Sequence, residues 1–460
     1  MQKDYADVIT EVCQLLFNAI CERESNLAGQ VPGLDGNIFQ LLRQIGWQLM
    51  SMLLSHLSSQ VTDDDLKLGY HVHRREKVKY FGLFGPIKVN SPYLWNRQTS
   101  QGARPVKNQL GITDGKRSVD LEKALVNLGA SQSYQQAARQ FEQHYGWCID
   151  RYRLRRAVVK IAPQAEEYVS ERLESLKTSY NKPLDERPGV EQILVEMDGC
   201  HLRTGIFQLA QTPTQEFTQK RHLQKKERTT EWREVRVGFA RELKNKEKRT
   251  FVAKMSKYPE VVNQLVSAAI DQGMSVLSNV YAVGDGGNGL RSELQKQFSN
   301  LQFILDRCHL KQHLYETAEE LGLSGSKKQN LVKKELSLIS AGKVQELLTN
   351  FQEYLAGGSA SAAITAKGSE RLARLYKYLQ QFYDCINYDR FIELGLPIGS
   401  GEIESAHRYI PQQRLKIPGA TWHPDNINQM LALRLIKANN WWSDFWKQFI
   451  PETHLLAIAA

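Results

Sequence analysis

Two aspartates end apolar, strand-like segments of the sequence, and each is followed by glycine. Asp198 closes ILVEMDG at residues 193–199, and Asp285 closes VYAVGDGG at residues 280–287. Open α/β sheets keep their ligand sites at the carboxyl ends of strands, and glycine allows close approach to the backbone there. Asp-Gly is also a common turn dipeptide, so either aspartate alone could simply open a turn. As a pair on neighbouring strands, they predict one shared site.

A third acid for this site should come from a helix beside the sheet. The segment PIGSGEIESAH, residues 397–407, offers Glu402 and Glu404. Residues two positions apart in a helix lie about 200° apart around its axis, so only one of them can face the site. Glu402 falls in the first turn, where an acid favours the helix dipole, whereas Glu404 shares a face with Ser400 and Arg408. We therefore expect Glu404 to complete the site.

Crowded carboxylates predict a divalent cation. Their charges repel, and the ionised state is costly unless a cation neutralises it. Mg²⁺ or Mn²⁺ fits best, since such hard cations take oxygen ligands and bind phosphates at their open positions. Two such ions about 3.5–4 Å apart can stabilise both the attacking and the leaving oxygen of a phosphodiester. Asp198, Asp285 and Glu404 are thus the predicted ligands of two Mg²⁺ or Mn²⁺ ions.

The elements that must position these acids form an α/β pattern. In residues 186–310 the periodicity predicts three strands, a helix and two more strands, which is typical of a mixed sheet: 191–199, 233–243, 249–256, helix 259–273, 278–287 and 301–309. Residues 311–392 are almost wholly helical, with a small-residue linker at 356–369, and resemble an insertion. Residues 393–440 return to the core, and an aromatic-rich helix is expected in 441–460.

Three smaller modules precede this core, so the chain should be multi-domain. Residues 1–65 predict two amphipathic helices with a break at 29–36, and residues 66–112 predict a β-hairpin that turns at Gly85–Pro86. Residues 113–185 have the proportions of a helix-turn-helix, with a helix from Ser133 to His144 and a turn at Gly146. Its second helix is expected to contact DNA through Arg151, Arg153, Arg155 and Arg156. The alternative is a basic amphipathic helix with solvated arginines.

Composition limits the class of protein. The 60 Lys and Arg exceed the 50 Asp and Glu, which favours a polyanionic partner such as nucleic acid or an anionic membrane. The six cysteines include no CxxC pair, so neither a zinc ribbon nor a disulfide framework is indicated, and reduced thiols suggest the cytoplasm. No signal peptide and no apolar run of about 20 residues is evident, so we expect no membrane partner.

With these residues in view, the sequence resembles the DDE insertion-sequence transposases, most closely those of the ISKra type. The resemblance spans roughly residues 185–450 and is carried by four segments: MDG at 197–199, GDG at 284–286, ILDRCHLKQHLYETAEELG at 304–322 and PIGSGEIESAHRYIPQQRLK at 397–416. It implies an RNase H-like catalytic core in which Asp198, Asp285 and Glu404 are the three catalytic acids. It also implies that Asp306 and His309 form the DxxH element, with His309 near the scissile phosphate.

The implied function is metal-dependent cleavage and strand transfer at the ends of an insertion sequence. The partners would be double-stranded DNA, both element ends and target, and further copies of the chain in a homodimer or higher oligomer, in the bacterial cytoplasm on the nucleoid. Phosphate contacts are implied for Arg408, Arg414 and Lys416. Two alternatives remain: a domesticated, catalytically inactive DNA-binding relative, and an RNase H-like nuclease or resolvase without strand joining.

Four further features bear on this hypothesis. Related sequences often carry cysteines after the FGPIKV hairpin, but SPYLWNR at 91–97 has none, so no zinc knuckle is expected there. Pro411 falls inside the predicted helix of Glu404 and should kink or end it. Residues 216–250 carry a net charge of +6, with 12 Lys and Arg against 6 Glu, and could flank phosphates, with Trp232 stacking on an unpaired base. His309 and His313 could instead be a packed or exposed helix pair, because a zinc site would need further ligands.

Overall fold

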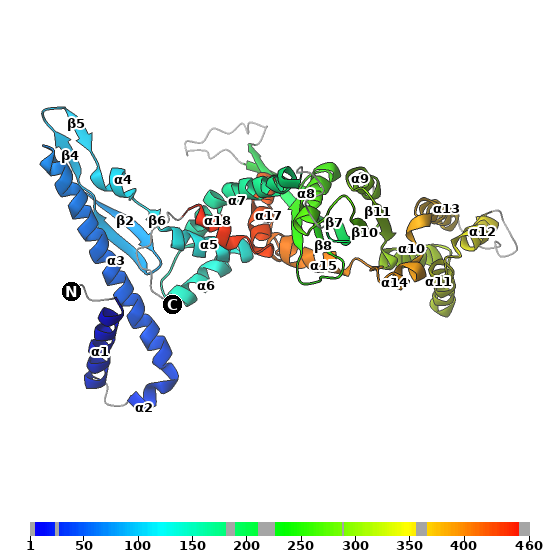
Figure 1. Ribbon diagram of the computed structural model, residues 1–460, viewed down its shortest axis with the longest axis horizontal. Coiled ribbons are helices and arrows are strands. Elements are labelled where there is room, and N and C mark those ends of the chain that lie inside the picture. The colour runs from blue at the N-terminus through cyan, green and yellow to red at the C-terminus, as the bar shows by residue number, and fades with distance from the viewer. Residues whose placement is uncertain are drawn as a thin grey trace, which may run out of the picture. The chain divides into compact units, whose positions relative to one another are not determined.

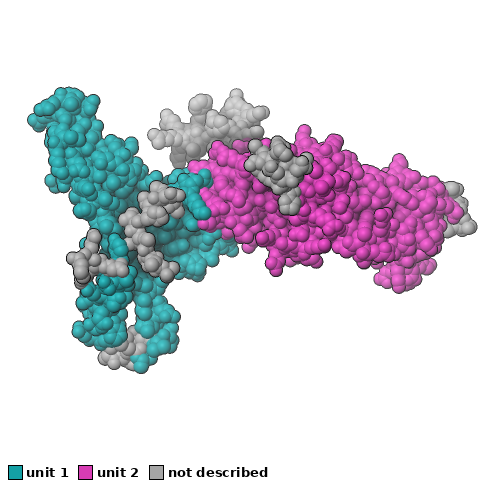
Figure 2. Space-filling model, in the orientation of Figure 1, with its two compact units in different colours: residues 1–160, 446–460 teal, residues 161–445 magenta. Residues whose placement is uncertain are grey.

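The computed structural model describes residues 5–23, 27–180, 189–209, 226–287, 289–355 and 366–449. The chain divides into two compact units (Figures 1 and 2), one of residues 1–160 and 446–460 and the other of residues 161–445. The boundary falls inside a single helix, and the finer division into seven segments stays a prediction. No helix among the described residues combines the length and the apolar character that a membrane crossing requires.

The first unit begins with helices, as predicted, but the break between them is earlier and the second helix is longer. Helix α1 (Tyr5–Arg23) is followed by α2 (Leu27–Gln30), a 3₁₀ turn at Val31–Gly33, and α3 (Leu34–Lys67). Gly36 therefore lies within the first turn of α3 rather than in the break. Helix α3 ends just before Gly69, whose φ of 87° lies in the left-handed region.

Two small sheets follow α3. One sheet has the strand order β1-β4-β5 and consists of β1 (His71–Arg74), β4 (Tyr93–Asn96) and β5 (Gln101–Ala103). The other has the order β3-β2-β6 and consists of β2 (Lys77–Gly82), β3 (Gly85–Asn90) and β6 (Lys116–Arg117). The predicted hairpin is β2–β3, but Gly82 pairs with Gly85, so the turn is at residues 83–84 and Gly85–Pro86 already belongs to β3. The buried side chains of β3, Ile87 and Val89, pack with Leu54 and Val61 of α3.

The predicted helix, turn and helix are confirmed as elements. After α4 (Pro105–Leu110) and α5 (Val119–Ser131), helix α6 (Tyr134–Tyr145) starts at Ser133, whose hydroxyl accepts from the Gln136 N–H, and it ends at Gly146 with φ 66°. The second helix, α7 (Arg151–Tyr180), runs for 30 residues. It continues far beyond Arg156, the last of the arginines predicted to contact DNA, and the unit boundary lies within it.

The second unit is built on a five-stranded mixed sheet, which confirms the predicted α/β class. The strand order is β11-β10-β7-β8-β9. The strands are β7 (Gln192–Leu209), β8 (Lys226–Glu242), β9 (Thr250–Lys254), β10 (Asn279–Gly284) and β11 (Leu301–Leu305). Strands β7, β8 and β9 are antiparallel neighbours, whereas β10 is parallel to both β7 and β11. The carboxyl ends of β7's first half, β10 and β11 therefore point the same way.

Helices cover both faces of this sheet. Helix α8 (Tyr258–Asp271) lies against the face that carries Gly238, because a Cβ at Gly238 would meet Leu265. Helix α15 (Gly401–His407) lies against the opposite face, where the Ile403 N–H meets Glu196. After α15 come a π-helical turn at Arg408–Gln412, α16 (Gln413–Leu415), α17 (Asp425–Ala438) and α18 (Trp442–Lys447).

The predicted insertion is helical, as expected. Short helix α9 (Leu290–Gln297) precedes β11, and the insertion comprises α10 (Arg307–Glu320), α11 (Gly325–Ser340), α12 (Val344–Leu355), α13 (Ala366–Gln381), a 3₁₀ turn at Tyr383–Cys385 and α14 (Tyr388–Glu393). Most of the predicted small-residue linker, residues 356–365, lies outside the described residues. The insertion thus leaves the sheet at β11 and returns directly before the segment that carries Glu404.

Candidate active site

The structure brings Asp198 and Asp285 together on adjacent parallel strands. The pairing of β7 with β10 ends where Glu196 lies beside Val283. Asp198 lies two residues further along β7, which continues to Leu209, and Asp285 directly follows the end of β10. Neighbouring strands are about 4.8 Å apart, so the two aspartates lie close to each other just past the end of this pairing. Burial raises the pKa of the Asp198 carboxyl; the Gly199 N–H opposes this rise and the charge of Asp285 adds to it.

Histidines surround this pair of acids. His407 of α15 is buried, and its Nε2 lies 3.5 Å from Oδ2 of Asp198. Burial lowers the pKa of His407 to about 4, so its imidazole is neutral near pH 7. Neither of its ring nitrogens hydrogen-bonds to any residue that the structure describes, which leaves polar atoms aimed at the acids. His309, in the first turn of α10, also acts on Asp198, because its charge lowers the pKa of that carboxyl.

Glu402 and Glu404 have separate environments, as the helical spacing predicted. Glu402 accepts from Arg241 at 2.7 and 3.1 Å and pairs with Arg249 at 3.3 Å. The Arg241 side chain is almost fully buried, so this acid balances a buried charge. Glu404 is exposed, and its charge raises the pKa of His407, which places it on the side of the acid pair.

The three predicted acids do not close into one ligand set. Across the described parts of the chain, no three His, Cys, Asp or Glu side chains converge closely enough to hold a metal ion. The donor type nevertheless suits a hard cation, because Mg²⁺ is commonly held by one or two carboxylates together with waters and substrate phosphates. Asp198 and Asp285 provide such a pair, and the unsatisfied ring nitrogens of His407 lie beside it.

In the DxxH element, Asp306 has a structural role. Asp306 is buried and caps α10 by accepting from the Cys308 N–H at 2.7 Å. It also accepts from the N–H of Ser400, at 3.2 Å, and from the Ser400 hydroxyl. The Arg307 N–H donates to the Ile398 carbonyl at 3.0 Å. Asp306 therefore ties the end of β11 to the loop before α15, while His309 on the same turn faces the acids.

Glu196 is a site residue that the sequence prediction missed. It lies two positions before Asp198, so it shares that face of β7, and it is 1% exposed. Its Oε2 accepts from the Ile403 N–H at 3.0 Å, in the first turn of α15. Burial raises the pKa of Glu196 to about 8. An acid inside the apolar run ILVEM was the available signal, because a buried charge needs a partner.

The loop of Asp285 is held by the insertion. The Tyr378 hydroxyl of α13 donates to the Asp285 carbonyl at 2.8 Å, and the Gly287 N–H donates to Oδ1 of Asp285 at 2.7 Å. Gly286 has φ 74°, and a Cβ there would come within 2.8 Å of the Tyr378 hydroxyl. The chain can pass so close to Tyr378 only because this residue is glycine.

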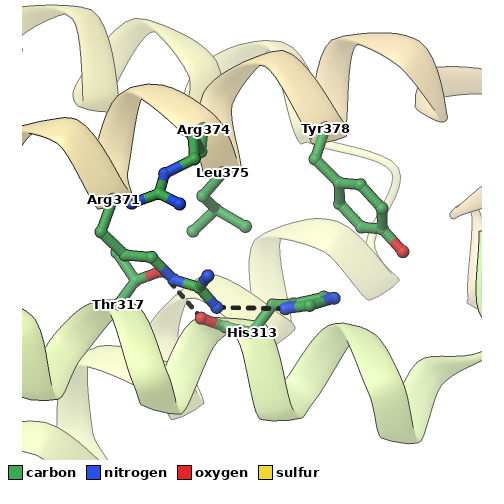
Figure 3. A pocket seen from close by; sticks show the side chains of 6 residues that line it. All are labelled: His313, Thr317, Arg371, Arg374, Leu375 and Tyr378. Carbon is green, nitrogen blue, oxygen red and sulfur yellow. Dashed lines mark hydrogen bonds between the residues drawn. The ribbon is translucent and has the colours of Figure 1, made fainter. Parts of the chain in front are cut away.

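Behind Tyr378 lies a small cavity of about 120 Å³ between α10 and α13. Figure 3 shows its lining side chains: His313, Thr317, Arg371, Arg374, Leu375 and Tyr378. The His313 ring meets Tyr378 edge to face, with centroids 5.1 Å apart, and its Nδ1 lies 3.2 Å from Nη2 of Arg371. Burial lowers the pKa of His313. His313 is thus a packed partner of Tyr378, in keeping with the helix-pair alternative to a zinc ligand.

Pro411 interrupts the helix, as predicted, and the interruption is a π-helical turn. The turn begins at Arg408, so Glu404 and His407 stay on the regular part, α15. Proline removes a backbone donor and frees carbonyls of the preceding turn. The carbonyl that loses a donor lies four or five residues before Pro411. The buried guanidinium of Arg434 on α17 instead donates to the two carbonyls that directly precede the proline, those of Tyr409 and, at 3.3 Å, Ile410. Such π turns are frequent at functional sites.

The predicted phosphate contacts in this unit divide into two groups. Arg408 and Lys416 are exposed, and the charge of Lys416 lowers the pKa of His407, which places it near the acids. Arg414 is 3% exposed and lies over the Trp422 ring at 4.8 Å, so the predicted DNA contact of Arg414 is wrong. It instead packs the segment after the π turn.

The basic segment 216–250 is also less available than its charge suggested. Residues 216–225 lie outside the described residues. In the described part, arginines pair with nearby acids, as in Arg233 with Glu231 and Arg236 with Glu234, while two more hold Glu402. Trp232 is exposed, and its stacking on a base stays a prediction.

In the first unit, three of the four arginines predicted to contact DNA are open. Arg151, Arg155 and Arg156 are exposed on α7. Arg153 is half-buried, lies over the Phe81 ring at 4.7 Å and pairs with Asp150 at 3.0 Å. Its contact with phosphate stays a prediction, because 42% of its side chain is exposed.

The fold and this site define a mixed α/β protein with two acids, Asp198 within β7 and Asp285 directly after β10, just past the end of the parallel pairing of these strands. The model of a family described as "Uncharacterised protein family (UPF0236)" matches residues 30–442. The chain belongs to this family. It is also 19% identical over 439 residues to a Streptococcus gallolyticus protein named "UPF0236 protein in vanSb 3'region", covering 91% of this chain and 85% of that one.

Proposed function

We propose that this protein is a DDE-type DNA transposase that uses a divalent metal to cleave phosphodiester bonds and transfer strands. The observation that carries the proposal is that Asp198 of β7 and Asp285, directly after β10, both lie just past the end of the parallel pairing of these strands. The strand order β9-β8-β7-β10-β11, with three antiparallel and two parallel strands, supports the RNase H-like core that the sequence resemblance implies. The resemblance in four motifs supplies the reaction class.

Asp198 and Asp285 would hold Mg²⁺ or Mn²⁺, with Glu404 as the third acid. The chemistry supplied by two such ions is activation of water or a 3′-hydroxyl and stabilisation of the leaving oxygen. The protein's own residues prepare the site for this. Repulsion between the aspartates favours a bound cation, and the neutral His407 beside Asp198 adds no competing charge. Exposed Arg408 and Lys416 would attract the phosphates of double-stranded DNA.

A second candidate is a DNA-binding relative whose chemistry has decayed. The observation that favours it is that Glu404 does not close a ligand set with the two aspartates. Such a protein would bind the same DNA but leave it intact. A nuclease or resolvase on the same core would cleave DNA but form no joined product.

These functions are separated by one assay with duplex DNA taken from the sequence that flanks the coding region. With Mg²⁺ present, the transposase predicts both cleaved and joined products. Asp198→Asn and Asp285→Asn keep the size of each side chain but remove its charge, so each should lower cleavage by roughly 100-fold or more. Gel resolution of end-labelled strands measures both products.

The matched control is Glu393→Gln, which removes an exposed acid of α14 away from the acid pair and should leave activity unchanged. Glu404→Gln distinguishes the roles on α15, since loss of cleavage there supports its place as third acid. Full cleavage by both aspartate variants would refute the proposal. DNA binding without cleavage in the wild type would support the decayed relative instead.

A further inference from the structure

Helices α1 and α3 expose more apolar surface than any helix of a self-contained unit requires. None of the 19 residues of α1 is buried. Its exposed apolar side chains include Ile9, Val12 and Leu15, and those of α3 include Leu42 and Met52. A helix of this length gains most of its stability from packing an apolar face, so α1 lacks a partner surface among the described residues (Figure 1).

Four exposed residues of α3, together with the partly buried Ile45, follow a coiled-coil pattern. Ile38, Leu42, Ile45, Leu49 and Met52 are spaced by four, three, four and three residues, which is the heptad spacing of a helix seam. This seam lies roughly opposite the side of α3 that is packed on β3 through Leu54 and Val61, given 100° per residue. Because both sides of α3 are apolar, it has the character of a helix buried between two layers.

The chemistry of the seam favours a second copy of the same chain. Between residues 36 and 62 the only formally charged side chain is Arg43, and its guanidinium donates to the carbonyls of Tyr145 and Gly146. Two such seams can therefore meet across a two-fold axis without like charges facing each other, as a self-complementary interface requires. The exposed apolar side chains of α1 and α3 together amount to on the order of 1,000 Å² per copy, enough for a stable interface of standard size.

A membrane surface fits this region less well. Helices that lie on membranes carry Lys and Arg on their polar face. In α1 the charged residues are Asp7, Glu11, Glu22 and Arg23, so acids predominate. The apolar face of α1 is therefore flanked by charges that an anionic lipid surface would repel.

We propose that α1 and α3 form the interface of a homodimer, with the two α3 seams packed antiparallel across a two-fold axis and the α1 helices completing a four-helix bundle. In this arrangement Ile45 lies near its own copy at the centre. Residues 5–57 are thus an association surface whose occupant is a second copy of this chain. The proposal does not depend on the proposed catalytic function, because it needs neither DNA nor metal.

The test is the mass of the full-length protein in solution, measured by light scattering without DNA or metal. The wild type should have twice the mass of one chain, and Leu42→Glu with Leu49→Glu should halve it, because two charges per copy would be buried in the seam. The matched control is Leu394→Glu, since Leu394 and Leu42 are both 56% exposed but Leu394 lies on the far side of the insertion in sequence. The control should remain dimeric.

Circular dichroism shows whether each variant keeps its helices, as exposed positions should. A monomeric wild type at micromolar concentration, or a double variant that remains folded and dimeric, would overturn the proposal. Co-sedimentation of the wild type with vesicles of anionic phospholipid, lost in the double variant, would overturn it in favour of a lipid surface.

Discussion

The two aspartates and the helix of Glu404 reach the same candidate site by different means. Asp198 and Asp285 are placed by the backbone register of β7 and β10, which is set within the sheet itself. Helix α15 has only seven residues and is held by side chains from elsewhere, namely Glu196, Asp306 and Arg434. Substitutions that weaken the site should therefore displace helix α15, which side chains hold, before they displace the two aspartates, which the pairing of strands holds.

Removal of Arg434 should have the largest effect on the half of the site that side chains hold. Arg434→Ala removes the side-chain donor to the carbonyls of Tyr409 and Ile410, and each buried group that is left unsatisfied costs about 1–3 kcal/mol. We expect the free energy of unfolding to fall by about 3 kcal/mol, measured by urea denaturation. Arg408→Ala, an exposed residue of the same turn, is the matched control and should change it little.

Hydrogen exchange shows which elements lose stability in the Arg434→Ala protein. Faster exchange in α15 than in β7 of the Arg434→Ala protein is the expected pattern, because the helix depends on the anchor and the strand does not. Equal acceleration in both would show that sheet and helix unfold as one unit and would remove the contrast.

The pH dependence of stability isolates the second anchor, Glu196. Its pKa of about 8 in the folded protein lies above the 4.5 of an ordinary glutamate, so the folded state holds a proton that the unfolded state has released. Stability should therefore fall as the pH rises from about 4.5 to about 8 and then level off. Glu196→Gln keeps an oxygen for the Ile403 N–H and removes this dependence.

The variant and the wild type should be similarly stable near pH 5. Near pH 9, Glu196→Gln should be more stable by on the order of 2–4 kcal/mol, since the wild type must then bury a charge. Denaturation curves at pH 5, 7 and 9 measure the difference. A constant gap at all three values would mean that Glu196 does not titrate in this range.

The contrast also explains what the sequence could predict. Asp285 was identifiable because it directly follows an apolar strand. Asp198 was identifiable by the same pattern, but the predicted strand end at Gly199 is wrong, because β7 continues to Leu209 in its antiparallel pairing with β8. The separation of Glu402 from Glu404 followed from helix geometry alone. The role of Glu196 needed one further step, since it lies two residues before Asp198 on the same face.

Other features depended on partners far away in the chain. Pro411 predicted an interruption, but neither its π-helical form nor its contact with Arg434, which is distant in sequence and packs onto the turn only in the fold. The burial of Arg414 could not be predicted either, because Trp422 covers it through a turn that its basic surroundings do not reveal. Charge alone therefore overestimated the phosphate contacts, whereas periodicity predicted the strands well.

The smallest expected effect tests whether the sheet half of the site is as self-sufficient as the register implies. Tyr378 donates to the Asp285 carbonyl from α13, so the second aspartate has one anchor outside the sheet. Tyr378→Phe should lower the free energy of unfolding by about 1 kcal/mol, the usual contribution of one such hydrogen bond. It should also weaken binding of Mn²⁺, measured by calorimetry, only slightly if backbone pairing places Asp285. The control is Tyr383→Phe, whose side chain is exposed. A large loss of Mn²⁺ affinity in Tyr378→Phe alone would show that the insertion, and not the strand register, positions the second acid.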